Sequence, residues 1–317
     1  MPIKLTRELI GKLAGIANPA DLAPVPAKVT AAPVAPAPVA HPVTELRAGN
    51  PKHILKIFAA PSLDEERRAT VAAMAEPRKR YLIAMTPRSG SSHLCDVLKN
   101  TKMMGRPGEM LSQLFIPNIL KRAPGATPDE YLSQVTRVVR TRNGVSGFKA
   151  SWFQFNDFRA AMQDESVFRA YRYIHLTRRD LAAQAVSLYC ATASNVFHTN
   201  VEHTSSEREK LQTLQYDFKK IKEWHSHILA QEMGWRQYFA QHDIYPLSIN
   251  YEEIEEDVTA VVRRLARFID MPRAGDCASS ESIFRKIGNR RNIEWAAQFA
   301  LDLDAERRAD QAAQTAR

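Results

Sequence analysis

Residues 81–94 read YLIAMTPRSGSSHL, and the fold prediction depends on this stretch. It opens with five consecutive apolar residues, a short and well-bounded run that predicts a buried β-strand. A tight turn rich in Gly and Ser follows, and the residues after it are helical in character. A strand, a Gly/Ser loop and a helix in this order aim backbone N–H groups and the positive end of the helix dipole at an anion. The sequence therefore predicts an anion-binding loop at the end of this strand.

The predicted loop differs from the usual loop of ATP- and GTP-binding proteins. The pattern GxxxxGK[ST] is absent, because Gly90 is followed by two serines and no lysine. The fixed positive charge is Arg88, two residues before the glycine. A nucleoside triphosphate site normally uses the lysine and a hydroxyl that ligates magnesium. The loop therefore suits a phosphate or sulfate group bound without a metal, and an ATP-dependent small-molecule kinase stays as the alternative enzyme.

Outward from the loop, strands and helices alternate along the chain. Three further apolar runs predict strands, at residues 145–150, 173–177 and 244–250. The stretches with helical character are residues 52–78, 128–141, 180–194, 207–241 and 252–269. Strands that alternate with helices favour a parallel sheet with helices on both faces. The predicted fold class is α/β, a P-loop-like parallel sheet flanked by helices.

The region before the compact domain divides by composition. Apolar residues recur at helical spacing in residues 1–17, among lysines and arginines, so a basic amphipathic helix is expected there. Such a helix can lie on an anionic membrane surface, and a short docking helix or a frayed terminus is the alternative. Residues 18–51 hold eight of the 18 prolines and predict an Ala/Pro-rich linker. The remaining expected segments are a helical lead-in at 52–79, the main domain at 80–305 and a polar tail at 306–317.

Composition excludes several classes of protein. The chain has 317 residues, of which 44 are Lys or Arg and 35 are Asp or Glu, giving a net charge of +9. Residues 1–80 carry +5 of this charge, so the main domain is only mildly basic and no nucleic acid partner is expected. No run of 18 apolar residues and no standard signal peptide is visible. The three cysteines, Cys95, Cys190 and Cys277, form neither a disulfide framework nor a metal-ligand pattern, which suits a cytoplasmic protein without a metal site.

Residues 87–92 resemble the 5′-phosphosulfate loop of sulfotransferases that use PAPS (3′-phosphoadenosine 5′-phosphosulfate). The likeness continues, in order, through residues 105–109, 143–149, 175–187, 234–236 and 291–295. Over residues 80–300 the chain is similar to the bacterial family that contains trehalose 2-sulfotransferase and lipopolysaccharide sulfotransferases. The resemblance implies the sulfotransferase fold, PAPS as cofactor and PAP, the 3′,5′-bisphosphate, as product. Residues 1–79 have no counterpart in it.

The resemblance also assigns roles to individual residues. Those expected to bind the cofactor are Arg88, Ser89, Gly90, Ser91, Ser92, Arg178, Ser187 and Arg291. In this set the loop residues hold the 5′-phosphosulfate, the pair Arg178 and Ser187 holds the 3′-phosphate, and Arg291 helps to enclose the nucleotide. Arg88 would also stabilise the leaving phosphate and the transferring sulfuryl group with its fork of donors. No residue is expected to bind a metal.

Two further residues are expected to act on the acceptor hydroxyl. Its proton must go to a general base within hydrogen-bond reach, and the resemblance places Glu109 in that role. Lys149 ends the second predicted strand, and the resemblance places it beside the reacting groups, where it steadies the sulfuryl oxygens or orients the acceptor. The predicted function is therefore PAPS-dependent sulfuryl transfer to a hydroxyl of a carbohydrate or glycolipid.

The acceptor itself is not defined by the sequence. Trehalose-specific members carry an acid three residues before the catalytic glutamate, where this chain has Arg106, so an anionic glycan such as lipopolysaccharide is favoured over trehalose. Residues 188–206, which are rich in aromatics and histidines, are the expected acceptor-binding loop. Contact with the inner face of the membrane and a homodimer are further expectations. A non-catalytic nucleotide-binding or membrane-docking protein is the alternative from a different class.

Overall fold

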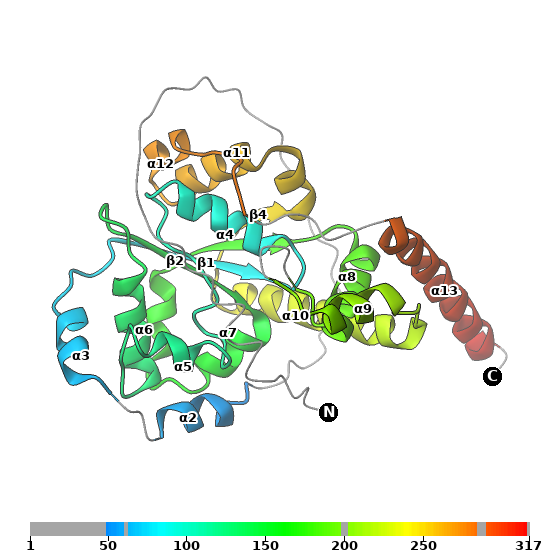
Figure 1. Ribbon diagram of the computed structural model, residues 1–317, viewed down its shortest axis with the longest axis horizontal. Helices are drawn as coiled ribbons and strands as arrows, with labels where there is room; N and C mark the ends of the chain where they lie inside the picture. The colour runs from blue at the N-terminus through cyan, green and yellow to red at the C-terminus, as the bar shows by residue number, and fades with distance from the viewer. Residues whose placement is uncertain (1–48, 60–62, 198–201, 284–289, 316–317) are drawn as a thin grey trace.

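The structure is a computed structural model, which describes residues 49–59, 63–197, 202–283 and 290–315 (Figure 1). The predicted amphipathic helix at 1–17 and nearly all of the predicted linker at 18–51 lie outside the described residues. In the described part of the chain, no helix is long and apolar enough to cross a membrane.

A parallel sheet of four strands forms the centre of the described structure. The strands are β1 (Lys79–Met85), β2 (Val145–Ser151), β3 (Arg172–Thr177) and β4 (Leu247–Asn250). They lie in the order β2-β1-β3-β4, and each neighbouring pair is parallel. This confirms the predicted parallel α/β sheet. β4 begins three residues later than predicted, because Pro246 directly before it has no N–H to donate to the ladder.

Helices cover both faces of the sheet and form a further group beside it (Figure 1). Their bounds are α2 (Lys52–Phe58), α3 (Glu65–Ala72), α4 (Ser91–Asn100), α5 (Ile116–Ile119), α6 (Pro128–Val138), α7 (Trp152–Arg159), the 3₁₀ helix η1 (Glu165–Ala170), α8 (Leu181–Ser194), α9 (Ser205–Thr213), α10 (Phe218–Gln241), α11 (Tyr251–Phe268), α12 (Pro272–Asp276) and α13 (Arg290–Thr315). The structure has two helices in each of two ranges that were predicted as one, residues 52–78 and residues 207–241. Asp64 caps the start of α3 and Asp217 caps the start of α10, so each helix begins anew within the predicted range.

Alternation along β1 separates the two main cores. Leu82 and Ala84 point to one face, where they pack with side chains of α2, α6, α7 and α10. Tyr81, Ile83 and Met85 point to the other, where they pack with α4, α11 and α12. A third cluster lies beside the sheet and joins α8, α10 and α13. β1 is therefore buried on both faces over residues 81–85, as its continuous apolar run predicts.

Gly147 allows the close approach of β1 and β2 at the face shared with α4. A Cβ atom at this position would lie 2.1 Å from the Tyr81 ring. The Tyr81 hydroxyl donates a hydrogen bond of 2.6 Å to the carbonyl of Met104. The glycine therefore leaves space for a buried tyrosine that ties the segment after α4 to the sheet.

The lead-in helices pack on the domain rather than standing apart from it. Ile54 and Phe58 of α2 belong to the core cluster that also includes β1 and β2 residues. The backbone N–H of Asn50 donates a hydrogen bond of 2.7 Å to Asp157 of α7. Residues before the predicted boundary at 79/80 thus contribute to the same core as the residues after it.

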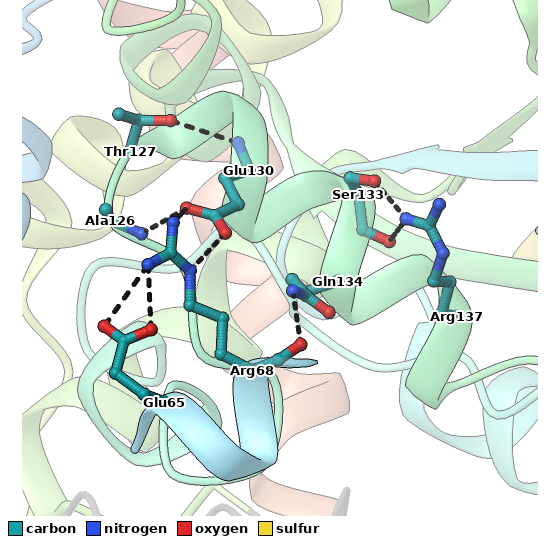
Figure 2. A network of polar contacts seen from close by, with 8 residues as sticks. All are labelled: Glu65, Arg68, Ala126, Thr127, Glu130, Ser133, Gln134 and Arg137. Atoms are coloured by element: carbon teal, nitrogen blue, oxygen red, sulfur yellow. Dashed lines mark hydrogen bonds and ion pairs between the residues drawn. The ribbon is translucent and has the colours of Figure 1, made fainter. Parts of the chain in front are cut away.

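A polar network fastens α3 to α6 (Figure 2). The Arg68 guanidinium donates to both carboxylate oxygens of Glu130, at 2.5 and 3.0 Å, and also to Glu65. The side-chain amide of Gln134 donates to the carbonyl of Arg68 at 3.2 Å. Burial alone would raise the pKa of Glu130, but the bonds from Arg68 lower it below the ordinary value. A paired arginine and a paired backbone carbonyl therefore fix how the two helices meet.

At the other end of the chain, α13 runs as one helix from Arg290 to Thr315. Ala296 and Phe299 pack against α8 and α10, and the residues after 303 are almost all exposed. The predicted boundary between the main domain and a polar tail, at 305/306, lies inside this helix.

We expect His175 of β3 to make the stability of the fold depend on pH. Its side chain is 8% exposed and packs against Phe239 at 5.4 Å between ring centroids. Burial, followed by the charge of Arg236, lowers its pKa to about 4 from an ordinary 6.5. Protonation therefore favours the unfolded chain, so this contribution is complete above pH 6.5 and falls by about 3 kcal/mol as the pH drops to 4.

The measurement for this prediction is thermal unfolding at pH 7.5 and at pH 4.5, for the wild type and for His175→Phe. The melting temperature of the variant should fall less between the two pH values than that of the wild type. Equal falls in both proteins would contradict the assignment of this pH dependence to His175.

Candidate functional site

The loop between β1 and α4 has the geometry of an anion site. Arg88 and Gly90 both have positive φ angles, 65° and 80°, so the chain reverses sharply before α4 begins. A Cβ atom at Gly90 would lie 2.7 Å from the Tyr251 ring, which adds a second reason for a glycine there. The first N–H groups of a helix have no acceptors within the helix. The N-terminus of α4 therefore offers backbone donors and a positive dipole end beside Arg88.

Gln184 of α8 braces this loop from the neighbouring helix. Its side-chain amide donates to the hydroxyl of Thr86 at 2.8 Å and to the carbonyl of Pro87 at 2.7 Å. Gln184 is fully buried, and Ser89 adds a bond of 2.7 Å from its hydroxyl to the carbonyl of Thr86. Gln184 and Ser89 therefore hold the loop in shape through bonds to residues that precede the N-terminus of α4.

Three of the predicted cofactor-binding residues meet at the loop. Arg88 donates from Nε to the hydroxyl of Ser187 at 3.0 Å, and Arg178 donates to the carbonyl of Arg88 at 3.4 Å. The Arg178 guanidinium lies over the Tyr251 ring, 4.4 Å from its centroid. Burial, followed by the charge of Arg178, lowers the pKa of Arg88 to about 10. Two neighbouring cations that remain charged at neutral pH create a positive potential suited to phosphate groups.

The ammonium group of Lys149 joins the loop to Glu109. Its Nζ atom donates to the hydroxyls of Ser91 at 3.2 Å and Ser92 at 3.0 Å, and lies 3.1 Å from Oε1 of Glu109. The Lys149 backbone N–H also donates to the carbonyl of Gly108 at 2.9 Å, so the segment carrying Glu109 runs beside the end of β2. The lysine is 6% exposed, whereas the Glu109 side chain is 26% exposed. A single side chain, that of Lys149, therefore connects the predicted general base to the predicted anion site.

Gln154, which the sequence analysis did not single out, holds the second oxygen of this carboxylate. Its side-chain amide donates to Oε2 of Glu109 at 2.9 Å, and its own oxygen accepts from the N–H of Ser151 at 3.0 Å. Ser151 and Gln154 form the capping box that begins α7. The Ser-x-x-Gln spacing was the available signal for the helix start, and the bond to Glu109 had no signal in the sequence.

Arg291 lies apart from these residues in the described structure. Its guanidinium donates to the carbonyls of Leu211 and Gln212, at 2.7 and 3.0 Å, and lies over the Trp295 ring. Burial raises the pKa of Cys190, while the charges of Arg291 and Arg88 both act to lower it. The Cys190 thiol on α8 is therefore within electrostatic range of both arginines. The hydrogen bonds of Arg291 go to the end of α9, and its ring contact is within α13.

The residues expected to bind the acceptor are divided between core and site. Tyr189 is 4% exposed, donates to the carbonyl of Gln215 and packs near Trp295, so it belongs to the core beside α13. The carbonyl of Phe197 accepts a bond of 2.7 Å from Arg88 and so touches the anion site. Arg106 is exposed, and its N–H donates to the carbonyl of Val139. Residues 198–201 of the predicted acceptor loop lie outside the described residues.

Taken together, these residues fit a phosphorylated and sulfated nucleotide. Arg88, Lys149 and Arg178 supply three positive charges around the N-terminus of α4. Nε of Arg178 is buried and has no hydrogen-bond acceptor among the residues that the structure describes. Within the described ranges, no three His, Cys, Asp or Glu side chains gather as metal ligands would. The fold and the site define a class of protein that binds a phosphate-bearing ligand at the carboxyl ends of parallel strands.

Comparison with known families identifies this class further. The profile of the Stf0 sulphotransferase family matches residues 80–302, which is more than half of the chain. The chain therefore belongs to the Stf0 sulphotransferase family. This confirms the family predicted from the loop and the motifs that follow it, and the family assignment supports PAPS as the sulfuryl donor.

Two similar proteins are trehalose 2-sulfotransferases. The one from Mycobacterium tuberculosis (strain ATCC 35801 / TMC 107 / Erdman) is 26% identical over 272 residues, and the one from Mycolicibacterium smegmatis (strain ATCC 700084 / mc(2)155) is 23% identical over 270 residues. In both comparisons the match covers 72% of this chain and 97% of the relative. A crystal structure of retinol dehydratase in complex with androsterone and inactive cofactor PAP is 14% identical, with a TM-score of 0.31, and covers 81% of this chain and 95% of that chain. A likeness with that TM-score supports no conclusion about the fold or the function of this chain.

Proposed function

We propose that this protein transfers a sulfuryl group from PAPS to a hydroxyl of a carbohydrate or glycolipid, with Glu109 as the general base. The observation that carries the proposal is the position of the Lys149 ammonium, which bonds to the hydroxyls of the anion loop and to the Glu109 carboxylate. One cation therefore joins the place where a donor phosphosulfate would lie to the group that would deprotonate an acceptor.

PAPS, when bound, supplies the sulfuryl group and a phosphate as leaving group. The N–H groups at the start of α4, from Ser91 and Ser92, would bind the 5′-phosphosulfate together with Ser89, Gly90 and Arg88. Arg178 and Ser187 would bind the 3′-phosphate, and the unpaired Nε of Arg178 supports this assignment. Charge placed near these fixed donors needs little reorganisation, which is the main source of catalysis in such transfers.

Glu109 would accept the proton of the acceptor hydroxyl as the acceptor oxygen forms its bond to sulfur. Both carboxylate oxygens are held, one by Lys149 and one by Gln154, so the group is oriented before the acceptor arrives. Lys149 and Arg88 would stabilise the charge that develops on the phosphate oxygen that leaves. The balance is one S–O bond formed, one S–O bond broken and one proton moved to Glu109.

A carbohydrate acceptor is supported by the names of the two similar proteins, both trehalose 2-sulfotransferases. This chain differs from the trehalose-specific pattern at Arg106, three residues before Glu109. A positive charge there favours an acceptor that carries anionic groups, such as a lipopolysaccharide or another acidic glycolipid. Action in the cytoplasm, contact with the membrane and a homodimer remain predictions from the sequence.

The rival function is phosphoryl transfer from ATP, and the metal requirement separates the two. We expect transfer of ³⁵S from labelled PAPS to pyranoside acceptors to be unchanged by EDTA, because fixed cations of the protein hold the donor. A kinase would need magnesium to neutralise the β- and γ-phosphates. Loss of transfer in EDTA, restored by magnesium, or transfer of ³²P from ATP in place of ³⁵S, would contradict the proposal.

A further inference from the structure

Three aromatic side chains form a continuous row that begins beside the residue bound to Glu109. Phe153 precedes Gln154 in the first turn of α7, and its ring lies 5.1 Å from the ring of His227 on α10. His227 in turn lies 5.3 Å from Trp224, one helical turn earlier on α10. We call Phe153, His227 and Trp224 the aromatic row.

The row is partly open to solvent, unlike the aromatic cluster of the main core next to it. All three residues have intermediate exposure, whereas the neighbouring Trp152 and Trp235 are 2% and 0% exposed. Phe153 packs against the core cluster of α7 and β2, and Trp224 packs against the cluster of α8 and α13. The row therefore crosses the junction between two cores and leaves ring surface outside both of them.

Its position relative to the sheet places it on the same side as the predicted chemistry. α7 begins directly after β2, at the strand end that carries Lys149. Gln154 in the same turn of helix donates to Glu109. Phe153 and Gln154 are consecutive residues of α7, so the aromatic row begins one residue away from the side chain that contacts Glu109.

We propose that the aromatic row binds a pyranose ring of the acceptor, through the apolar C–H face of the sugar. This inference rests on the proposed function, since it names the acceptor subsite of the same reaction. Aromatic side chains with a few polar groups nearby are the usual lining of small-molecule sites, and the ring faces carry negative charge that attracts C–H groups. The rings are inclined to one another by 55° and 82°, so they form a curved wall rather than a flat platform.

The chemistry of each ring suits a neutral sugar face. Burial lowers the pKa of His227, so its imidazole is uncharged at neutral pH and carries no charge against the C–H groups. The steps of 5.1 and 5.3 Å between ring centroids are comparable to the width of one sugar ring, so the row suits two linked rings.

The test measures sugar binding separately from donor binding. Saturation-transfer NMR would follow trehalose, maltose and methyl α-D-glucopyranoside titrated into the full chain saturated with PAP. Trp224→Leu and Phe153→Leu should each weaken pyranoside binding about tenfold, the loss expected when one aromatic contact of about 1.4 kcal/mol is removed. Tyr245→Leu is the control, because Tyr245 is an exposed aromatic side chain that belongs neither to the aromatic row nor to the candidate site.

The outcomes separate this inference from the proposed function. Weakened sugar binding in both row variants, with normal PAP affinity, supports the subsite. PAP binding by the wild type together with no pyranoside binding, or with equal sugar binding in the row variants and the control, would overturn the subsite and leave the donor site intact. Failure of the wild type to bind PAP would overturn the proposed function, and the subsite with it.

Discussion

Replacing Glu109 by Gln should lower the turnover of sulfuryl transfer about 10²–10⁴-fold, the usual contribution of a positioned general base. The amide keeps the size of the side chain and can still accept a bond from Lys149, but it cannot take the acceptor proton. The affinity for PAP should be nearly unchanged, because Glu109 is linked to the hydroxyls of the anion loop through Lys149. Initial rates with saturating PAPS and calorimetric titration with PAP would measure the two quantities.

The control for this variant is Glu66→Gln, which removes the same charge from an exposed position on α3. It should keep both the turnover and the PAP affinity of the wild type. Near wild-type turnover in Glu109→Gln would remove this residue from the role of base. A large loss of PAP affinity in Glu109→Gln would assign it to donor binding instead.

Replacing Lys149 by Met should lower kcat/KM for transfer about 10²–10³-fold, the size expected when one preorganised charge facing the reacting group is removed. Met fills nearly the same space in a position that is 6% exposed, so the packing at the end of β2 should survive. The variant loses the cation that bonds to Ser91, Ser92 and Glu109. PAP affinity should also fall, since this cation lies on the anion loop.

Combining Lys149→Met with Glu109→Gln tests whether the two groups act as one unit. Side chains in direct contact at an active site give losses that do not add. The double variant should therefore be little worse than the poorer single variant, measured as kcat/KM with the same acceptor. Full additivity of the two losses would show that the Lys149–Glu109 contact has no role in transfer.

The sheet could be predicted because its strands carry the signal within themselves. The apolar run of β1 and the loop that follows it predict a buried strand leading through a tight turn into a helix, and the structure has this arrangement. α7 was not predicted, although Trp152, Phe155 and Phe158 have the spacing of a helix face, because the helix has only eight residues and follows β2 directly. Packing against Trp235 of α10 decides in favour of the helix, and that contact joins residues about eighty positions apart.

The sequence predicted which residues make up the candidate site, but it did not predict how they contact one another. Arg88, Arg178 and Ser187 were expected to share one ligand, and the structure brings them together through direct hydrogen bonds. The bond between Lys149 and Glu109 depends on the segment before Glu109 lying beside β2, which no local pattern encodes. Arg291 was selected by resemblance alone; its guanidinium bonds to the end of α9 and lies over Trp295 of α13, and its part in cofactor binding stays a prediction.

The central claim is that the loop and Arg178 bind a nucleotide carrying both a 5′- and a 3′-phosphate. Calorimetric titration of the full chain with PAP, then with ADP, and then with ATP plus magnesium tests it most directly. We predict micromolar binding of PAP that weakens at least about tenfold when the 3′-phosphate is absent, a difference of about 1.4 kcal/mol. Equal or tighter binding of ATP with magnesium would contradict the claim and make the chain a nucleoside triphosphate enzyme instead.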